Sequence, residues 1–353
     1  MPKTRQVGAL DGTGHAVVVT EPVPPLAKGC LLVETHASLI SPGTELSQAK
    51  LQRKDPAAQA GQPRPFGYQN AGVVLKVGEG VKEFKPGDRV ACMGAGARHA
   101  NYCVVPKNLC ARMPDNVSFE QGAFCHLAMT SLHAVRRGEP ELGENLLVVG
   151  LGLVGQMAAR LGQIAGMYVM GWDIEPFRCE LAKRWGIDDT AVVGQEDETA
   201  KARAFTRNLG FDMAVMAFGG DGTKAFQSVK NVMLLSPDTH QMGRICLVGG
   251  LRTELAWGAN LGNLDLRCCS RTGPGYHDDP WEVGEIEYPP VFIRWTTRSN
   301  MEYVLRLMSE GKFDVNCLVS HRLPLSKIDE AVTAHIDQPN ATMGTLLLMD
   351  HDR

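Results

Sequence analysis

The sequence predicts an α/β protein in two parts, a compact antiparallel β unit followed by a doubly wound parallel sheet. Residues 1 to about 135 show short β-type runs separated by Gly and Pro, without a helical rhythm. From residue 145 onwards, apolar strand-like runs alternate with helical stretches, as a parallel sheet requires. A chain of 353 residues is long enough to give each part a sizeable core.

The first part is predicted to be a β barrel or sandwich. The stretch Leu51–Pro65, which is rich in Gln, Ala and Pro, predicts a loose surface loop between strands. The strand-like runs are HAVVVTEP, LLVETHASLI, NAGVVLKVGEGV, DRVACMG and NYCVVP.

A helical segment that starts at Phe119, FEQGAFCHLAMTSLHAVRRG, leads from the first part into the second. Within it, His126 and Thr130 are four residues apart, which puts both side chains on one face of the helix. We therefore expect that they can face the same site.

The stretch Asn145–Asp173 carries the most informative motif, NLLVVGLGLVGQMAARLGQIAGMYVMGWD. The apolar run Leu146–Val149 predicts a buried parallel strand, and G-x-G-x-x-G follows it where a helix over Gln156–Ala165 must begin. Such glycines permit a tight turn, a close approach of the backbone to a pyrophosphate, and close packing of helix on strand. The residues expected to bind the phosphates of a dinucleotide at this helix N-terminus are Gly150, Gly152, Leu153, Val154 and Gly155.

The acidic residue that ends the next strand, Tyr168–Trp172, selects between cofactors. Asp173 lies where a carboxylate hydrogen-bonds the two hydroxyls of the adenosine ribose. It would repel a 2′-phosphate, and we expect no cation to pair with that phosphate, so the sequence favours NAD over NADP. Arg178, five residues further on, either stacks on the adenine or is a solvated residue in the first turn of the next helix.

Further strand-like runs continue the parallel sheet, each preceded by a helical stretch: TAVVG, FDMAVMAFG, RICLVGG and LDLRCCS. Ligands of such sheets bind at the carboxyl ends of the strands, which predicts that Phe218-Gly219 and Val248-Gly249-Gly250 lie beside the cofactor. Glycines at these positions can equally serve only to turn the chain. Nearer the C-terminus, a helix is expected near Ser299–Glu310 and a strand in GTLLLM.

The composition points to a small-molecule substrate. With 36 basic and 39 acidic residues the net charge is −3, which provides no basic field for nucleic acid or an anionic membrane. We find no 18-residue apolar stretch and no apolar run after Met1–Arg5, so neither a transmembrane helix nor a signal peptide is expected. The ten cysteines include no C-x-x-C pair, and we expect buried thiols in a reducing cytoplasm.

The order of these parts resembles the medium-chain dehydrogenase/reductase superfamily of alcohol and polyol dehydrogenases. The most specific matches are GYQNAGVVLKVGEGVKEFKPGDRV, residues 67–90, and GLGLVG. The resemblance implies a GroES-like catalytic domain over 1–135, a Rossmann NAD-binding domain over 136–276, and a return segment over 277–353 that completes the catalytic domain. It also implies a homodimer or homotetramer, in which LDLRCCS is a candidate edge for pairing across a two-fold axis.

The sequence departs from zinc-containing members of this family at the metal site. Those members have Cys in C-x-[ST]-D, His-Glu in G-H-E-x-x-G, and Cys or Glu in the helix before the Rossmann domain. The matching positions here are Pro42, Tyr68 and His126, and proline cannot ligate a metal, so we expect no bound metal. The four-cysteine structural-zinc lobe is also missing. S-P-G-T-E, G-Y-Q-N, SRTGPG and RWT resemble a zinc-lacking branch that includes bacteriochlorophyllide dehydrogenase-like proteins and the dehydrogenase halves of bacterial two-domain oxidoreductases.

The resemblance assigns roles to individual residues. Thr44 matches the hydroxyl that relays a proton from the substrate, and Thr130 falls near the nicotinamide carboxamide. Four residues occupy the former metal cavity and its surroundings, and one lies in a loop that often borders it: Glu45, Tyr68, Gln69 and His126, with His99 in the loop.

A zinc-free site needs another group to stabilise alkoxide charge. Tyr68 offers a phenol donor, and His126 offers an imidazole whose pKa is expected to lie close to the working pH. In most proteins such a tyrosine or histidine is simply a packed core residue. Here the position at the former metal cavity favours function for both.

Three functional hypotheses follow. The first is a zinc-independent, NAD(H)-dependent oxidoreductase acting on a secondary alcohol or ketone of a sugar, polyol or cyclic metabolite. The second is a zinc-free NAD(P)H-dependent reductase of an activated C=C bond, similar to quinone and enoyl reductases, which Asp173 disfavours. The third is a non-catalytic NAD-binding redox sensor or regulatory subunit.

Overall fold

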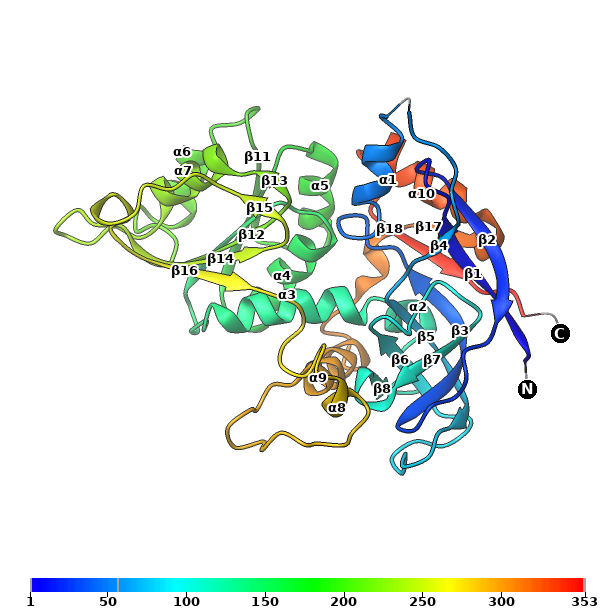
Figure 1. Ribbon diagram of the computed structural model, residues 1–353. Coiled ribbons are helices and arrows are strands. Elements are labelled where there is room, and N and C mark those ends of the chain that lie inside the picture. The colour runs from blue at the N-terminus through cyan, green and yellow to red at the C-terminus, as the bar shows by residue number, and fades with distance from the viewer. Residues whose placement is uncertain (1, 56, 352–353) are drawn as a thin grey trace. The chain divides into compact units, whose positions relative to one another are not determined.

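A computed structural model describes residues 2–55 and 57–351, and these residues form two compact units (Figure 1). The first unit comprises Met1–Met129 together with Thr272–Arg353, and the second comprises Thr130–Arg271. The divisions fall at 129/130 and 271/272, where the sequence predicted 135/136 and 276/277. The C-terminal segment thus returns to the first unit.

The first unit is built on antiparallel strands. A three-stranded sheet has the order β2-β1-β4, and a larger sheet has the order β17-β18-β3-β5-β6-β8, with β7 also paired to β3. The strands are β1 Thr4–Leu10, β2 Ala16–Pro22, β3 Cys30–Leu39, β4 Arg64–Pro65, β5 Gln69–Val77, β6 Arg89–Met93, β7 Tyr102–Pro106, β8 Cys110–Arg112, β17 Val319–Pro324 and β18 Gly344–Leu348. The expected loop Leu51–Pro65 includes residue 56, which lies outside the described residues; β4 occupies its end.

The C-terminal segment completes the larger sheet because β18 pairs with the central strand β3, with Leu346 opposite Leu39. β17 then pairs in parallel with β18. The helices of this unit are α1 Ser47–Gln52, α2 Phe119–Gly122, α8 Asp279–Glu282, α9 Thr297–Ser309 and α10 Ile328–Asp337, with 3₁₀ turns η1 Lys107–Leu109, η3 Val315–Leu318 and η4 Leu325–Lys327.

The single helix expected from Phe119 is two helices in the structure. Ser118 and Gln121 form a capping box at the start of α2, which ends at Gly122, and α3 Cys125–Arg137 follows. His126 and Thr130 both lie on α3, as expected, although Thr130 belongs to the second unit.

The second unit is a six-stranded, wholly parallel sheet of order β11-β10-β9-β12-β14-β16. This order reverses direction between β9 and β12, as in a dinucleotide-binding Rossmann sheet. The fold class predicted from the sequence is therefore confirmed. The strands are β9 Asn145–Val149, β10 Tyr168–Asp173, β11 Asp189–Val192, β12 Met213–Ala217, β14 Met242–Val248 and β16 Asn263–Cys269, with the small pair β13 Gly220–Asp221 and β15 Leu251–Arg252.

Right-handed crossovers place α4 and α5 on one face of this sheet and α6 and α7 on the other. The bounds are α4 Leu153–Ile164, α5 Pro176–Arg184, α6 Glu198–Phe205 and α7 Thr223–Val232. α4 begins at Leu153, three residues before the predicted Gln156, so Gly152 is its N-cap. β16 is preceded only by the 3₁₀ turn η2 Ala259–Leu261, not by the helix expected before it.

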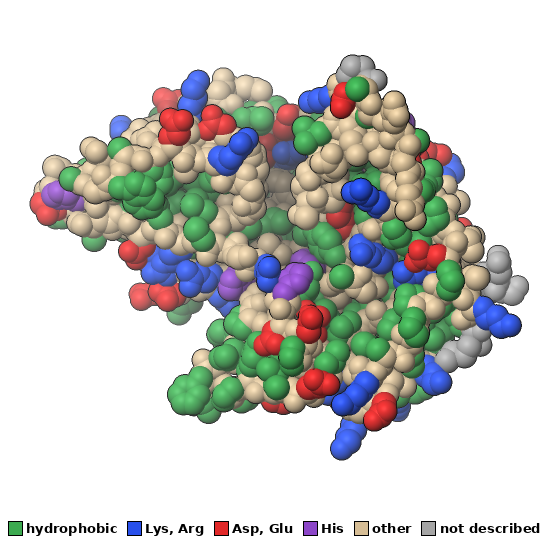
Figure 2. Space-filling model, in the orientation of Figure 1, with side chains coloured by type: hydrophobic (Ala, Val, Ile, Leu, Met, Phe, Trp, Pro, Cys, Tyr) green, Lys and Arg blue, Asp and Glu red, His purple; other side chains and the backbone are tan. Residues whose placement is uncertain are grey.

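The surface carries no broad region of one charge on the face drawn in Figure 2, where Lys and Arg alternate with Asp and Glu. Eight cysteines are buried as expected, whereas Cys268 and Cys317 are exposed, and all ten are free thiols. No helix in the described part of the chain is long and apolar enough to cross a membrane.

Candidate active site

The glycine motif of the second unit has the geometry that a pyrophosphate loop needs. Gly150 follows β9 with φ +89°, a conformation that favours glycine, and Gly152 caps α4. A Cβ on Gly155 would lie 1.8 Å from the carbonyl oxygen of Gly150, so only glycine permits this helix to start so close to the strand. Leu153 and Val154 form the first turn of α4, whose N–H groups are available to an anion.

The other expected cofactor residues lie at the same edge of the sheet. Phe218 and Gly219 directly follow β12, while Val248 ends β14 and is followed by Gly249 and Gly250. Because β9 and β12 flank the point where the strand order reverses, their carboxyl ends border the crevice in which such sheets bind ligands. The residues present therefore fit a dinucleotide, and direct contact with it stays a prediction.

Asp173 is buried and already engaged within the protein. Its carboxylate accepts hydrogen bonds from the backbone N–H of Leu151 at 2.6 Å and of Glu175 at 2.9 Å. These bonds tie the end of β10 to the glycine loop and orient the carboxylate. The guanidinium of Arg178 lies 3.5 Å from the same carboxylate.

Arg178 lies in the first turn of α5, and its side chain is 28% exposed. Its Nε is buried without a hydrogen-bond partner among the described residues. The stacking of Arg178 on adenine stays a prediction, and its charge is also available to a 2′-phosphate.

The cofactor preference can be tested at this pair. We expect NAD(H) to bind more tightly than NADP(H), and Asp173→Ser to narrow the difference by removing the repulsion and freeing Arg178. The double variant Asp173→Ser with Arg178→Gln should lose the affinity for NADPH that Asp173→Ser gains. Calorimetric titration measures each affinity, with Lys183→Gln at the exposed side of α5 as the control. Tighter binding of NADPH to the unmodified chain would contradict the prediction.

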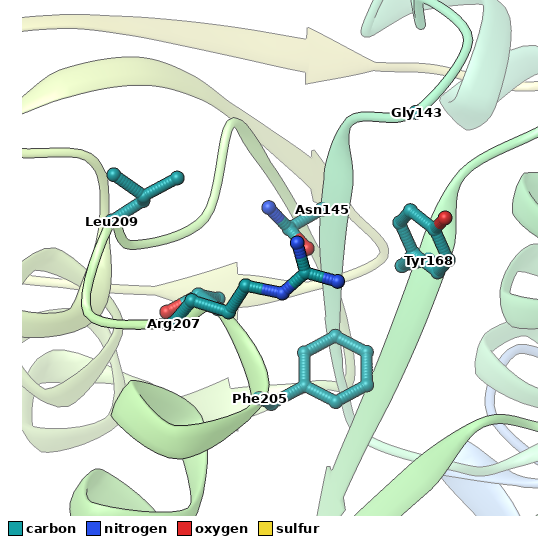
Figure 3. A pocket seen from close by; sticks show the side chains of 7 residues that line it. Gly143, Asn145, Tyr168, Phe205, Arg207 and Leu209 are labelled. Carbon is teal, nitrogen blue, oxygen red and sulfur yellow. The ribbon is translucent and has the colours of Figure 1, made fainter.

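One pocket of the second unit lies at the opposite edge of the sheet, with a volume of about 210 Å³ (Figure 3). Asn145 and Tyr168, which begin β9 and β10, line it, and Figure 3 shows Arg207 reaching towards them over Phe205. The amino ends of parallel strands are not where such sheets bind dinucleotides. This pocket is therefore not the cofactor site.

In the first unit, the structure brings Tyr68 and His126 together. Tyr68 directly precedes β5 and His126 lies in the first turn of α3, and their ring centroids are 4.4 Å apart. Tyr276 closes the group, with its ring edge-to-face against His126 at 5.7 Å. Sequence reasoning missed Tyr276 and its neighbour His277, although both directly follow the SRTGPG motif.

Tyr68 is held as a neutral phenol. Burial is the main reason that its pKa is raised well above the ordinary value, and the nearby Glu45 carboxylate raises the pKa further. Hydrogen bonds with the side chains of Ser41 and Thr44 act in the opposite direction. The phenol can therefore donate a hydrogen bond throughout the neutral range, and Thr44 is hydrogen-bonded to it. The relay role of Thr44 stays a prediction.

His126 does not match the expectation of an imidazole that titrates near the working pH. Burial lowers the pKa of His126 to about 3, and His277 lowers it further, while a hydrogen bond with the Tyr68 backbone acts in the opposite direction. The imidazole is therefore neutral and cannot make the rate depend on pH at neutrality. The expectation is wrong because it used the value for an exposed side chain.

Buried neutral histidines predict a loss of stability in acid. His335 on α10 is buried, and burial, with smaller contributions from Lys50 and His321, lowers the pKa of His335 to about 3. The unfolded chain, with an ordinary pKa of 6.5, takes up the proton first, so stability falls as pH falls from about 6.5 towards 3. At pH 5 we expect a loss of about 2 kcal/mol for each such histidine. Urea unfolding at pH 7.5 and 5.0 measures the free energy of unfolding at each pH. The difference between the two values should be smaller for His335→Gln than for the exposed control His240→Gln.

The residues at the family's zinc position do not fit a metal. Pro42 offers no ligand, Tyr68 is kept protonated, and His126 is the one remaining donor. Within residues 2–55 and 57–351, the only group of three His, Cys, Asp or Glu side chains close enough to hold a metal is Glu34, His36 and His351, which are none of these residues. No step of the chemistry is therefore assigned to a metal in the cavity.

A buried chain of polar groups links Glu45, His99 and Ser38. His99 Nε2 lies 3.2 Å from Glu45 Oε2, and His99 Nδ1 lies 2.5 Å from Ser38 Oγ. Ser38 Oγ in turn donates to the carbonyl oxygen of Gln69 at 2.7 Å. The backbone at Gly67, with φ +107°, passes so close to the loop that a Cβ there would lie 2.3 Å from the backbone nitrogen of His99. Glycine is therefore required for this approach.

The hydrogen-bond directions determine how many protons this chain holds. A carbonyl only accepts, so the Ser38 hydroxyl must donate to Gln69, and Nδ1 of His99 must then carry a proton that it donates to Ser38. One more proton must lie between Nε2 and Glu45, since two lone pairs would otherwise face each other at 3.2 Å. The pair is thus either imidazolium with carboxylate or imidazole with carboxylic acid, and its net charge is zero.

One carboxylate oxygen of Glu45 takes no part in these hydrogen bonds. Oε2 also accepts the backbone N–H of Ser41 at 2.8 Å, whereas Oε1 is buried and has no hydrogen-bond partner among the described residues. A buried acceptor without a partner is costly unless something uses it. Oε1 is therefore the candidate atom to receive a proton from the cavity.

The amide of Gln69 is engaged by the protein itself. Its side chain is fully buried, donating to the carbonyl of Leu39 at 3.1 Å and accepting from the N–H of Leu127 at 3.3 Å. These bonds hold the end of β3 against the start of α3. A catalytic role for Gln69 stays a prediction.

Comparisons with known proteins agree with this geometry. Residues 27–137 match the alcohol dehydrogenase GroES-like domain. Sorbitol dehydrogenase of Mus musculus is 28% identical over 299 residues, which cover 76% of each chain. L-Idonate 5-dehydrogenase of Vitis vinifera is 27% identical and covers 76% of this chain and 74% of its own.

These matches support the medium-chain dehydrogenase/reductase superfamily. Among solved structures, an Escherichia coli oxidoreductase/dehydrogenase of unknown specificity involved in membrane biogenesis aligns with a TM-score of 0.80 and 17% identity. That alignment covers 99% of this chain and all of the other, and at this identity it shows the fold alone. The similarity in fold therefore extends over the residues of both units.

Proposed function

We propose that this chain is a zinc-independent, NAD(H)-dependent dehydrogenase that interconverts a secondary alcohol and a ketone of a sugar, polyol or cyclic metabolite. The relatives, sorbitol and L-idonate dehydrogenases, indicate a dehydrogenase that acts on CH–OH groups. The observation that carries the zinc-free part is the contact of Tyr68 with His126 where relatives of the family hold their metal. We also infer a cytoplasmic location, because ten free thiols suit a reducing compartment.

Tyr68 is assigned the role of hydrogen-bond donor to the substrate oxygen. Its neutral phenol can stabilise the charge that develops on this oxygen, a task that zinc performs in the metal-containing relatives. His126 packs against the phenol as a neutral imidazole and orients it. When bound, the nicotinamide accepts or donates the hydride.

Glu45 is assigned the role of general base in alcohol oxidation. The proton that leaves the substrate hydroxyl passes to the hydroxyls of Tyr68 and Thr44, which hydrogen-bond each other. Its final acceptor is Oε1 of Glu45, which has no hydrogen-bond partner among the described residues and must gain one from this relay during the transfer. His99 acts as a positioning residue, because its contact with Oε2 orients the carboxylate and balances its charge. In ketone reduction the same groups return the proton to the substrate oxygen.

The test is a substrate screen with NAD⁺ and a panel of polyols, sugars and sugar acids, following the absorbance of the reduced nicotinamide. Turnover of at least one polyol or sugar acid, unchanged after treatment with a chelator, is the expected result. Turnover of enones or quinones with NADPH alone would support the C=C reductase instead. Tight binding of NAD without turnover of any substrate would favour the redox sensor.

We predict at least a homodimer, formed through β16. In the described residues this strand has a neighbour on one side only, β14, and Leu264 and Leu266 lie on it half-buried. An unpaired edge strand is a template for another strand, and a two-fold axis satisfies it. Light scattering should give twice or four times the chain mass, and Leu266→Lys should shift it towards the monomer. A monomeric wild type at micromolar concentration would contradict this.

A further inference from the structure

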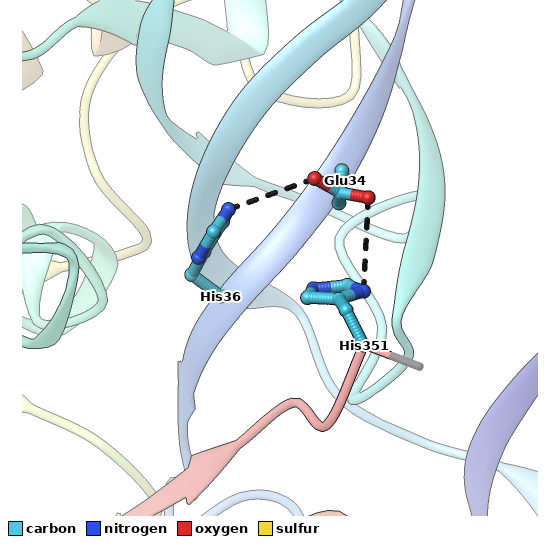
Figure 4. Close-up of side chains that lie close together, drawn as sticks. All are labelled: Glu34, His36 and His351. Carbon is cyan, nitrogen blue, oxygen red and sulfur yellow. Dashed lines mark ion pairs between the residues drawn. The ribbon is translucent and has the colours of Figure 1, made fainter. Parts of the chain in front are cut away.

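A second cluster of ligating side chains lies away from the cavity, on the central strand of the first unit. Glu34 and His36 are two residues apart on β3, so both side chains project from the same face. His351 follows β18 and is carried along β3, because the N–H of Met349 donates to the carbonyl of His36 at 3.0 Å. Figure 4 shows the Glu34 carboxylate between the two imidazoles.

The three ligand atoms converge without bonding to one another. Glu34 lies 3.8 Å from His36 Nε2 and 3.7 Å from His351 Nδ1, and all three ligand atoms lie within 4.8 Å of each other. These separations are too long for hydrogen bonds, and they are ion pairs only when the histidines are protonated (dashed lines in Figure 4).

His351 is held in the form that can ligate a cation. Its Nε2 lies 2.7 Å from the carbonyl oxygen of Thr35, which only accepts, so Nε2 must carry the proton. In the neutral imidazole, Nδ1 is then left with a lone pair, 3.7 Å from the Glu34 carboxylate. This nitrogen is buried and has no hydrogen-bond partner among the described residues. A backbone carbonyl that orients a histidine through its far nitrogen is the usual second contact of a metal-bound imidazole.

We propose that Glu34, His36 and His351 bind a divalent transition-metal ion of the zinc type. Two imidazoles and one carboxylate form a ligand set that suits Zn²⁺ and leave a fourth position to water. Bonds of about 2.1 Å to a tetrahedral ion require ligand atoms about 3.4 Å apart. The three ligand atoms lie within 4.8 Å of one another, so binding would bring them closer by at most about 1.4 Å.

The surroundings of the cluster are compatible with a cation. Arg89 is a positive charge that acts on His36, and it is stacked over Phe119, whose ring stacks on His36 at 4.4 Å. Its guanidinium is directed towards the carbonyls of Pro114, Asp115 and Val117. The bound ion would cross-link the segment after β18 to β3, and so would raise the thermal stability of the first unit. The proposal does not depend on the reaction proposed above.

The experiment uses the full chain, without a polyhistidine tag, after removal of metals with a chelator. Calorimetric titration with Zn²⁺ should show one site per chain, Co²⁺ should give a visible absorption band, and Zn²⁺ should raise Tm. Glu34→Gln and His351→Ala should each lower Zn²⁺ affinity at least tenfold. His240→Gln, which alters an exposed histidine 3.4 Å from Asp238, should bind as the wild type does.

Each alternative outcome overturns the proposal. Equal Zn²⁺ affinity of the wild type, Glu34→Gln and His351→Ala would show that the cluster binds nothing. Loss of the site in His126→Asn, with the two cluster variants unaffected, would place the metal in the cavity and would also contradict the zinc-independent mechanism. His36→Ala provides a third cluster variant in case His351→Ala fails to fold, and circular dichroism monitors folding in every case.

Discussion

Replacing Tyr68 by Phe should lower kcat by ~10²-fold or more while leaving NAD binding unchanged. The change removes one oxygen and keeps the ring, so the contact with His126 at 4.4 Å and the packing volume are preserved. What is lost is a donor that burial and Glu45 keep protonated. Steady-state kinetics with the best substrate of the screen, together with calorimetric titration of NAD⁺, measure the two effects separately.

Two further variants make this result interpretable. Tyr168→Phe alters a tyrosine that is 57% exposed in the second unit, and should leave kcat unchanged. His126→Asn should lower kcat by disturbing the phenol, but should keep the shape of the pH profile near neutrality, because the pKa of His126 is about 3. Near-normal kcat in both Tyr68→Phe and His126→Asn would mean that the cavity is merely filled, and would leave the chemistry to Thr44, Glu45 and His99.

The fold could be predicted from the sequence because its signals are local. The apolar run before Gly150 and the glycine spacing indicate a strand and a helix start within a dozen residues, and the structure has β9 and α4 there. The helix that was expected before β16 is absent, because the chain there continues through β15 and the short turn η2. The break between α2 and α3 was missed although Gly122 ends α2, because a single glycine is tolerated inside a helical pattern and was not taken as a helix end.

The candidate site was predictable only in part, because its energetics depend on long-range contacts. Positions 68 and 126 could be singled out by their place in the motifs, and the structure brings both rings together. Ser38 was missed because nothing in a β-strand sequence shows that it contacts a loop residue 61 positions away. The neutral state of His126 and the partner of Asp173 follow from burial and from side-chain geometry, which motif spacing does not contain.

The second large effect is expected from Glu45→Gln, which should lower kcat for alcohol oxidation by ~10²- to 10⁴-fold, the usual range for removal of a general base. Gln keeps the size of the side chain but cannot accept a proton from the substrate. Glu330→Gln, which alters an exposed carboxylate on α10, is the matched control and should leave kcat unchanged.

His99→Gln tests whether His99 acts through Glu45. As a positioning residue it should lower kcat and shift the pH profile in the wild-type background, yet add little in the Glu45→Gln background, where the base is already absent. Such non-additivity is not expected if His99 only fills space, because loss of packing would then add to the loss of the base. Thermal unfolding of Glu45→Gln, His99→Gln and the double variant shows how much of each loss in kcat comes from lower stability. Strictly additive losses, with an unchanged pH profile, would remove the Glu45–His99 pair from the mechanism.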